Sequence, residues 1–250
     1  MIVLKTRREL DLMREACRIS ANALREAGKA VEPGVSTQEI DDVVRNYIRK
    51  QGASPSFLGY GGFPASACIS VNNVVIHGIP SKKQILKSGD IVSVDVGAFI
   101  GGFHGDNAYT YACGDISKEA RALLDATKES LYEGIKQAKA GNRVGDIGNA
   151  VQSYAEARSY SVVRDFVGHG VGAKLHEDPS VPNYGTPGRG VRLMPGMTIA
   201  IEPMITAGDY AVKVLDDDWT TVTADGSLAA HFEHTIAITS DGPVIMTIPD

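Results

Sequence analysis

The stretch from Ile91 to Thr110, IVSVDVGAFIGGFHGDNAYT, alternates apolar with small or polar residues on both sides of Gly101-Gly102. This pattern is typical of a β-hairpin, because glycine readily adopts the positive φ angles of tight turns. With the two glycines as turn residues, Asp106 lies opposite Gly97 and diagonal to Asp95 on the same face. If the turn begins one residue earlier, the two acids lie directly opposite each other. Either register brings two like charges together, and this predicts a cation or a shared proton between them.

A second copy of the first strand follows 107 residues later in the chain. Leu193–Glu202 (LMPGMTIAIE) aligns without a gap with Leu86–Asp95 (LKSGDIVSVD), so the acids that end the two segments coincide. His231–Glu233 likewise resembles His104–Asp106. The connection between Glu202 and Glu233 is about twenty residues longer than the connection between Asp95 and Asp106. We therefore expect four carboxylates from two similar halves at one point. Since burying unpaired ions is costly, multivalent cations are the natural explanation for such a cluster.

The same offset relates two predicted helices. Capping boxes at Thr6–Glu9 and Ser36–Glu39 begin two helices in the first half, and Ser117 caps a long helix in the second. The apolar positions of the second and fourth helices match at this spacing: Ile40, Val43, Val44, Tyr47 and Ile48 on Ile147, Ala150, Val151, Tyr154 and Ala155. We expect a duplicated unit of two helices followed by antiparallel strands. It would form one domain over residues 1–250, with halves of about 1–113 and 114–250.

Composition narrows the class of protein. The 250 residues are 43% hydrophobic and 22% charged, with a formal net charge of -5, which gives no reason to expect sequence-specific nucleic-acid binding. Cys17, Cys68 and Cys113 form no CxxC pair, so neither a disulfide framework nor a zinc finger is indicated. No apolar run approaches the length of a membrane span, and no signal-peptide core begins the chain. A cytoplasmic, membrane-independent protein is expected.

Glycines surround one histidine in Gly168–Gly172 (GHGVG), shortly before Lys174–Pro179 (KLHEDP). The glycines flanking His169 leave its ring accessible and allow another group to approach the backbone closely. Taken alone, the segment is equally consistent with a glycine-rich turn that carries an incidental histidine. Its spacing does not fit a dinucleotide-binding fingerprint.

Five of these residues stand in the order and contexts of the methionine aminopeptidases: Asp95, Asp106, His169 in GHG, Glu202 in IEPM and Glu233 in FEHT. The chain resembles this family over almost its whole length and is most similar to the short bacterial type I form. The resemblance implies a single metallopeptidase domain with the pita-bread fold. This is an α/β (α+β) architecture with a pseudo-two-fold internal repeat and an antiparallel sheet flanked by helices.

The resemblance also implies a site for two divalent metal ions. Asp95 would bind one ion, Asp106 and Glu233 would bridge both, and His169 and Glu202 would complete the other. Oxygen-rich ligands with one imidazole suit Co²⁺, Mn²⁺, Fe²⁺ or Zn²⁺, and the sequence does not choose among them. A hydroxide bridging the ions would attack the scissile carbonyl, with Glu202 as the proton shuttle. His77 and His176 would hydrogen-bond the reacting peptide group.

Recognition of methionine requires a narrow apolar slot beside the ions. The expected substrate-binding residues are Tyr60, Phe63, Cys68, His77, His176 and Trp219, with Phe57 and Leu175 contributing to the wall. About twenty more residues separate Glu202 from Glu233 than separate Asp95 from Asp106, and Trp219 lies in this additional stretch. Because the stretch must leave the metals and return to them, Trp219 is included in the set. Some family members carry cysteine, tyrosine and phenylalanine in place of Phe57, Phe63 and Leu175. His231 lies two residues before Glu233, and its role is left open.

The expected activity is removal of the initiator methionine from nascent proteins and peptides, with preference for a small second residue. Two alternatives stay open: a proline-specific peptidase of the same fold, and a non-catalytic module that binds peptides or the ribosome. We expect a monomer whose partner is the N-terminal methionine of nascent polypeptides, with the ribosome as its candidate macromolecular partner.

Overall fold

The computed structural model describes residues 1–250, and its helices begin where the capping residues predict. Thr6 and Ser36 each accept a hydrogen bond from the backbone N–H of the glutamate three residues later, and that glutamate bonds back to the cap residue. The helices of the second half start at the expected positions, so that the second and fourth are 107 residues apart. Their bounds are α1 (Arg7–Lys29), α2 (Thr37–Lys50), α3 (Lys118–Gln137) and α4 (Val144–Glu156).

The central hairpin consists of β4 (Ile91–Ile100) and β5 (Phe103–Ala112), joined by Gly101 and Gly102 with φ angles of 62° and 86°. Gly97 pairs with Asp106 and Asp95 pairs with Ala108. The first of the two registers considered is therefore confirmed, with the acids diagonal to each other. β2 (Ala67–Val71) and the short β1 (Ser54–Pro55) pair with the other edge of β4.

In the second half the corresponding strands are interrupted at the acids. β9 (Thr198–Ile201) pairs with β14 (His234–Thr239), and β10 (Met204–Thr206) pairs with β13 (Ala229–His231) in the same register. Glu202 and Glu233 lie between these two ladders, directly across from each other. β7 (Gly168–Gly170), β8 (Glu177–Val181) and β15 (Gly242–Ile245) complete a five-stranded sheet, and β6 (Ser161–Val162) pairs with β10.

The excess residues of the second half form a small sheet with the first half. β11 (Val212–Val214) and β12 (Thr221–Thr223) make a hairpin, and β12 pairs with β3 (Val74–Ile76). A short 3₁₀ helix, η1 (Tyr60–Gly62), lies in the glycine-rich loop before β2. This excursion therefore connects the halves at the end of the strands that carry the acids.

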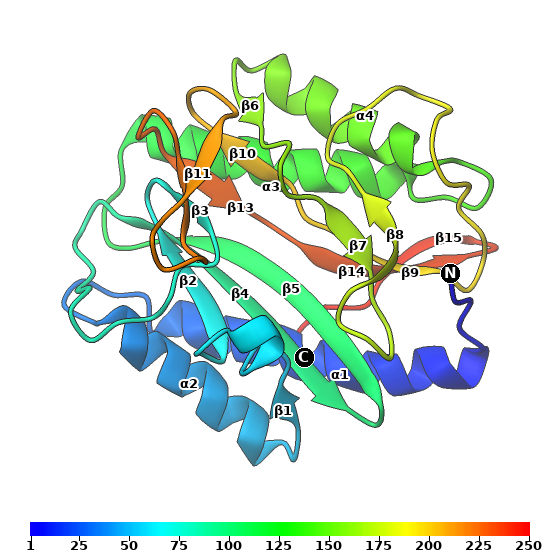
Figure 1. The fold of residues 1–250 in the computed structure, drawn as a ribbon, viewed down its shortest axis with the longest axis horizontal. Coiled ribbons are helices and arrows are strands. Elements are labelled where there is room, and N and C mark those ends of the chain that lie inside the picture. The colour runs from blue at the N-terminus through cyan, green and yellow to red at the C-terminus, as the bar shows by residue number, and fades with distance from the viewer.

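Strands lie between the two helix pairs, with α1 and α2 on one side and α3 and α4 on the other (Figure 1). Each half has its own apolar core. The halves meet along β5, where the N–H of Glu233 donates to the Ala108 carbonyl at 2.9 Å and the Thr235 hydroxyl donates to the Asp106 carbonyl at 2.8 Å. None of the helices has the length and apolar character needed to cross a bilayer. The duplication places the acids of both halves at this seam.

Candidate metal centre and active site

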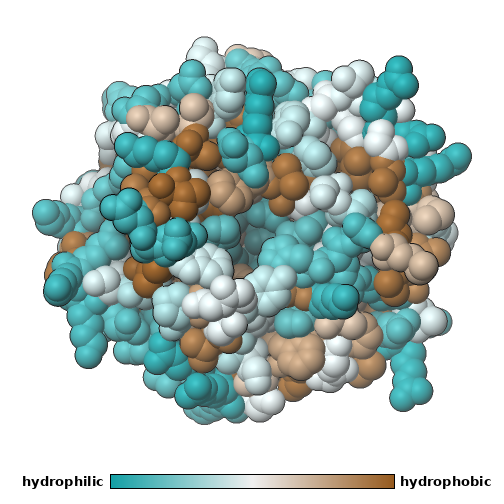
Figure 2. All heavy atoms as spheres, viewed as in Figure 1, coloured by the Kyte–Doolittle hydropathy of each residue, from teal (hydrophilic) through white to brown (hydrophobic).

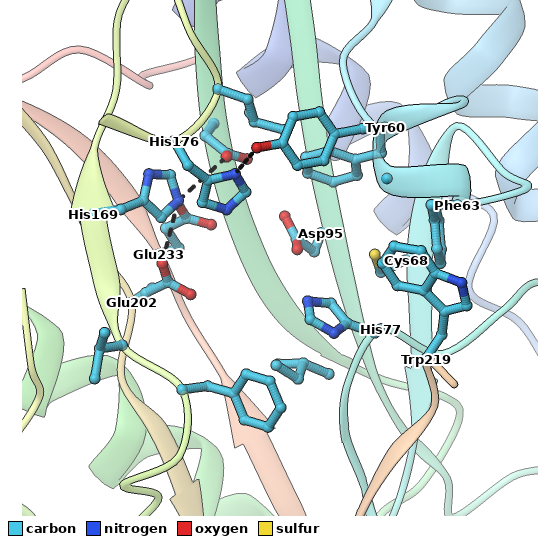
Figure 3. A pocket seen from close by; sticks show the side chains of 17 residues that line it. Tyr60, Phe63, Cys68, His77, Asp95, His169, His176, Glu202, Trp219 and Glu233 are labelled. Carbon is cyan, nitrogen blue, oxygen red and sulfur yellow. Dashed lines mark hydrogen bonds and ion pairs between the residues drawn. The ribbon is translucent and has the colours of Figure 1, made fainter. Parts of the chain in front are cut away.

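A cavity of about 300 Å³ opens at the seam between the halves. Figure 2 shows the same face of the molecule as Figure 1, hollowed near its centre. The cavity is lined by every site residue expected from the sequence, namely Phe57, Tyr60, Phe63, Cys68, His77, Asp95, Asp106, His169, Leu175, His176, Glu202, Trp219 and Glu233. In Figure 3, Glu202, Glu233 and His169 lie on one side and Phe63, Cys68 and Trp219 on the other, with Asp95 and His77 between them. The cavity thus has a polar end and an apolar end.

The polar end brings ligand atoms within reach of one centre. Asp106, His169 and Glu233 each offer one such atom, and these three atoms lie within 4.8 Å of one another. The Nε2 atom of His169 is 3.5 Å from Glu202 Oε1 and 3.9 Å from Asp106 Oδ2. Asp95 lines the same cavity from the neighbouring strand β4.

Burial dominates the electrostatics of these acids. Desolvation and the neighbouring acids raise the pKa values of Asp95, Glu202 and Glu233 well above their usual range. The same desolvation raises the pKa of Asp106 to about 7. In the absence of compensating positive charge, the cluster would hold protons that isolated carboxyl groups release near pH 4.

The carboxylates also have oxygen atoms without partners. Asp95 Oδ1, Asp106 Oδ1 and Glu233 Oε1 are buried and accept no hydrogen bond. Buried polar atoms are normally satisfied, so three orphaned oxygens in one cavity require an explanation. Divalent cations bound by carboxylates and one imidazole supply it, and the donor set fits such ions.

The hydrogen bond of His169 orients its ring for this purpose. Nδ1 lies 2.8 Å from the Gly170 carbonyl oxygen and donates to it, which leaves the Nε2 lone pair facing the acids. Burial and His176 lower the pKa of His169 to about 3, so the ring is neutral. A neutral imidazole with its other nitrogen bonded to a carbonyl is the usual form of a metal-binding histidine.

Two further histidines border the cavity without joining the acids. The His176 ring is tilted relative to that of His169 with 4.1 Å between ring centroids, and its Nδ1 is 2.8 Å from the Tyr60 hydroxyl. His77 has a φ angle of 59°, a left-handed conformation that is uncommon for a residue with a side chain. Desolvation lowers the pKa of His77 to about 4, so this ring is neutral near pH 7. Strained backbone of this kind is concentrated at functional sites.

Aromatic residues close the apolar end. Trp219 packs edge-on against Phe63 with ring centroids 5.1 Å apart, and its ring lies 6.0 Å from that of His77. A Cβ atom on Gly61 would lie 3.3 Å from the indole, so the glycine-rich loop approaches Trp219 closely. The excursion that carries Trp219 does return to the cavity, as its length predicts.

The structure adds apolar residues that sequence reasoning missed, and it places His231, whose role the sequence left open. Ile76, Phe166 and Val167 also line the cavity, and the Phe166 ring is edge-on to His77 with centroids 5.6 Å apart. His231 is buried, and its Nε2 lies 3.6 Å from Glu202 Oε2. Phe166 and Val167 directly precede the GHG segment, and this nearness in sequence was the one available signal.

Comparison with known proteins gives matches over the full length of the chain. The model of metallopeptidase family M24 matches residues 11–240. Methionine aminopeptidase 1 of Bacillus subtilis (strain 168) is 54% identical over 247 residues, which cover 99% of both chains. A methionine aminopeptidase of Clostridium perfringens is 55% identical over 248 residues, with the same coverage.

Solved structures agree with these sequence matches. The crystal structure of methionine aminopeptidase from Thermotoga maritima superposes with a TM-score of 0.97 at 48% identity and 99% coverage of both chains. This likeness confirms the pita-bread fold that the family resemblance implies and with which the internal repeat agrees. An Xaa-Pro dipeptidase from Bacillus anthracis shares the fold with a TM-score of 0.79 at 25% identity, and the chain covers 61% of that protein.

Proposed function

The chain belongs to metallopeptidase family M24, among the type I methionine aminopeptidases, and from this premise we propose how its cavity removes an N-terminal methionine. The observation that carries the proposal is the convergence of four carboxylates and one imidazole, with three orphaned oxygen atoms, at the polar end of a cavity whose other end is apolar. Metal chemistry at one end and side-chain recognition at the other are what such a reaction needs.

The polar end would hold two divalent ions. Asp95 would hold one ion, His169 and Glu202 would hold the other, and Asp106 and Glu233 would serve both. Ions bound there supply an activated water nucleophile and polarise the carbonyl that it attacks. Four carboxylates would balance the charge of two divalent ions, which would offset the desolvation that raises all four pKa values and the mutual repulsion that adds to it for Asp95, Glu202 and Glu233. Co²⁺, Mn²⁺, Fe²⁺ and Zn²⁺ all fit this donor set.

Three side chains are placed to handle hydrogen bonds and protons around the peptide group. His77 and His176 have pKa values lowered by burial, so they are neutral near pH 7 and can donate from an N–H. We assign them to the reacting carbonyl and the leaving amine, where such donors stabilise developing charge. Glu202 lies between His169 and His231 at the edge of the acid cluster, and we assign it the transfer of the proton from water to the amine.

The apolar end would accept the methionine side chain. Phe63, Cys68 and Trp219 form an enclosed slot, and Tyr60 lies at its rim with 45% of its surface exposed. Because His176 and Tyr60 approach each other across the entrance, little room remains beyond the scissile bond. This favours glycine, alanine or serine as the second residue.

The cellular setting follows from the same proposal. We expect residues 1–250 to act as one domain and as a monomer in the cytoplasm. Its partners would be the N-terminal methionines of nascent polypeptides, with the ribosome as the candidate for association. Both halves supply ligands to one cavity, so neither half could perform the reaction alone.

Peptide hydrolysis tests the proposal. The purified chain is stripped of metal, reloaded with each of the four ions in turn, and incubated with Met-Ala, Met-Lys and Ala-Pro peptides. Release of methionine from Met-Ala, weak release from Met-Lys and no cleavage of Ala-Pro are expected. Preferential cleavage of Ala-Pro would instead support the proline-specific alternative, whose fold the chain shares. Absence of hydrolysis with every ion would favour a binding module.

A further inference from the structure

An ion pair is buried on the far side of the loop that carries His176. Lys5, in the segment before α1, places its Nζ atom 2.5 Å from Glu177 Oε2. The side chains are 3% and 8% exposed, although most ion pairs of this chain lie at the surface. Lys5 Nζ also donates to the Val3 carbonyl at 3.3 Å.

The pair is packed directly against the loop. A Cβ atom on Gly172 would lie 2.5 Å from Lys5 Cε and 2.7 Å from Glu177 Oε1, so the ends of the two side chains pack closely on the backbone of Gly172. The same Glu177 Oε1 accepts the backbone N–H of Lys174 at 3.1 Å. Glu177 pairs with Gly170 across β7 and β8. The Glu177 carboxylate therefore holds the Lys174 end of the turn between His169 and His176, while the backbone pairing of Glu177 with Gly170 holds its other end.

Lys5 is itself held by the second half of the molecule. Its backbone N–H donates to the Gly196 carbonyl at 2.7 Å, and Gly196 in turn donates to Ile238 in β14 at 2.9 Å. The backbone of Lys5 is thus anchored to the second half, and its buried ammonium group reaches from there to Glu177. By contrast, the side-chain partner of His176 is Tyr60, which is 45% exposed and lies on a glycine-rich loop.

We propose that Lys5 is a positioning residue for the hydrolysis of methionyl peptides, acting through Glu177 to hold the His176 ring against the reacting carbonyl. This inference rests on the proposed function and adds to it Lys5, which is far in sequence from the residues that line the cavity. A buried ion pair adds little net stability, because desolvation of the two charges offsets their attraction. Fixed placement of the adjacent His176 is what this pair contributes. Displacement of a reacting group by about 1 Å can cost about 10²-fold in rate.

The test removes the charges and measures kcat, KM and bound metal. Lys5→Met keeps the length of the side chain but leaves Glu177 unpaired. The double variant Lys5→Met/Glu177→Gln leaves no buried charge and serves if the single variant does not fold. Arg7→Met, which removes an exposed cation two residues away, is the matched control. We expect kcat on a Met-Ala peptide to fall about 10- to 100-fold in the double variant. Metal content should equal that of the wild type, and KM should change by less than about threefold.

The same charge removal in a His176→Ala background separates positioning from a general structural effect. If Lys5 acts through His176, removing the two charges from the His176→Ala variant lowers kcat further by less than about twofold. The group that Lys5 positions is already gone in that variant. A full 10- to 100-fold loss repeated in that background overturns the proposal, as does a double variant whose kcat matches that of Arg7→Met. Failure of the proposed function would appear separately, as a wild-type chain that releases no methionine.

Discussion

Single residues in this cavity divide into those that balance charge and those that donate hydrogen bonds. The four acids have raised pKa values, and three of them, Asp95, Asp106 and Glu233, have a buried oxygen without a hydrogen-bond partner, as expected of ligands for cations. His77 and His176 are neutral, and neither belongs to the cluster of atoms within 4.8 Å. Substitutions in the two groups should therefore have different effects on metal content.

His176→Ala should lower kcat about 10²–10⁴-fold while leaving the bound metal unchanged, because its donor acts on the substrate. Glu202→Gln is the contrasting variant and should lower both metal content and turnover. Metal analysis and steady-state kinetics on a Met-Ala peptide measure the two effects. A metal-free His176→Ala protein would place this histidine among the ligands instead.

The cavity residues differ in how well sequence predicts them. Acids at matched positions of a repeat have few roles other than charge, so Asp95 and Glu202 could be predicted together. Phe166 and Ile76 could not, because apolar side chains serve a core and a cavity wall equally well. His231 lies two residues before Glu233 in the sequence, but its contact with Glu202 depends on the pairing of β10 with β13, which the repeat alone does not specify.

Secondary-structure elements place the acids by register, and the two copies do so differently. Asp95 and Asp106 are diagonal on β4 and β5, whereas Glu202 and Glu233 face each other between two short ladders. The hairpin pattern predicted two registers for the first copy, and only the turn geometry at Gly101 and Gly102 decides between them. Side-chain alternation has period two, so it specifies the face of a strand more firmly than its partner residue.

The β11–β12 excursion should determine substrate selectivity through Trp219. Trp219→Ala removes aromatic contacts worth roughly 1.5–3 kcal/mol, so KM for Met-Ala should rise and the preference for Met-Ala over Met-Leu should narrow. Val214→Ala, in the same excursion but 52% exposed, is the control and should change neither. If Trp219→Ala leaves the kinetic constants for both peptides unchanged, the excursion does not shape the slot.

Packing of α1 on β5 depends on Gly105. A Cβ atom there would lie 2.5 Å from the Cys17 Cα and 2.6 Å from the Ala16 carbonyl carbon, both on the helix backbone. Gly105→Ala should therefore lower the free energy of unfolding by about 1–3 kcal/mol, because the backbones must separate. Urea denaturation measures this change. An unaltered denaturation midpoint would mean that α1 can move away from β5 without loss of stability.

Across the whole molecule, bound metal should join two halves that otherwise repel each other. Asp95 and Asp106 come from the first half, and His169, Glu202 and Glu233 from the second. The internal repeat predicted this convergence, since matched acids must meet near a common axis. It could not predict that β12 pairs with β3, because that contact has no counterpart in the other copy.

Metal removal should make stability depend on pH. Without ions, the folded acids have raised pKa values, about 7 for Asp106, while in the unfolded chain they titrate near pH 4. The folded state then binds more protons than the unfolded state in this window, so its stability is lost as pH rises through about 7.

Thermal unfolding with metal and with chelator at about pH 5 and about pH 8 checks this expectation. The gain in Tm from metal should be larger at the higher pH, where the unpaired carboxylates repel most. A gain that shrinks on going to the higher pH would contradict the placement of these acids around cations.

The segment 207–228 has consequences for how such a protein can evolve. The repeat gives both halves a frame of helices and strands, and the four acids occupy matched positions in that frame. The segment has no duplicate, and its tryptophan faces the opposite end of the cavity. Mutation can therefore alter which side chain is admitted without moving a residue at the polar end. Selectivity for the substrate side chain and the residues at the polar end can therefore change independently in evolution. New substrate preferences can arise by mutation of segment 207–228 alone.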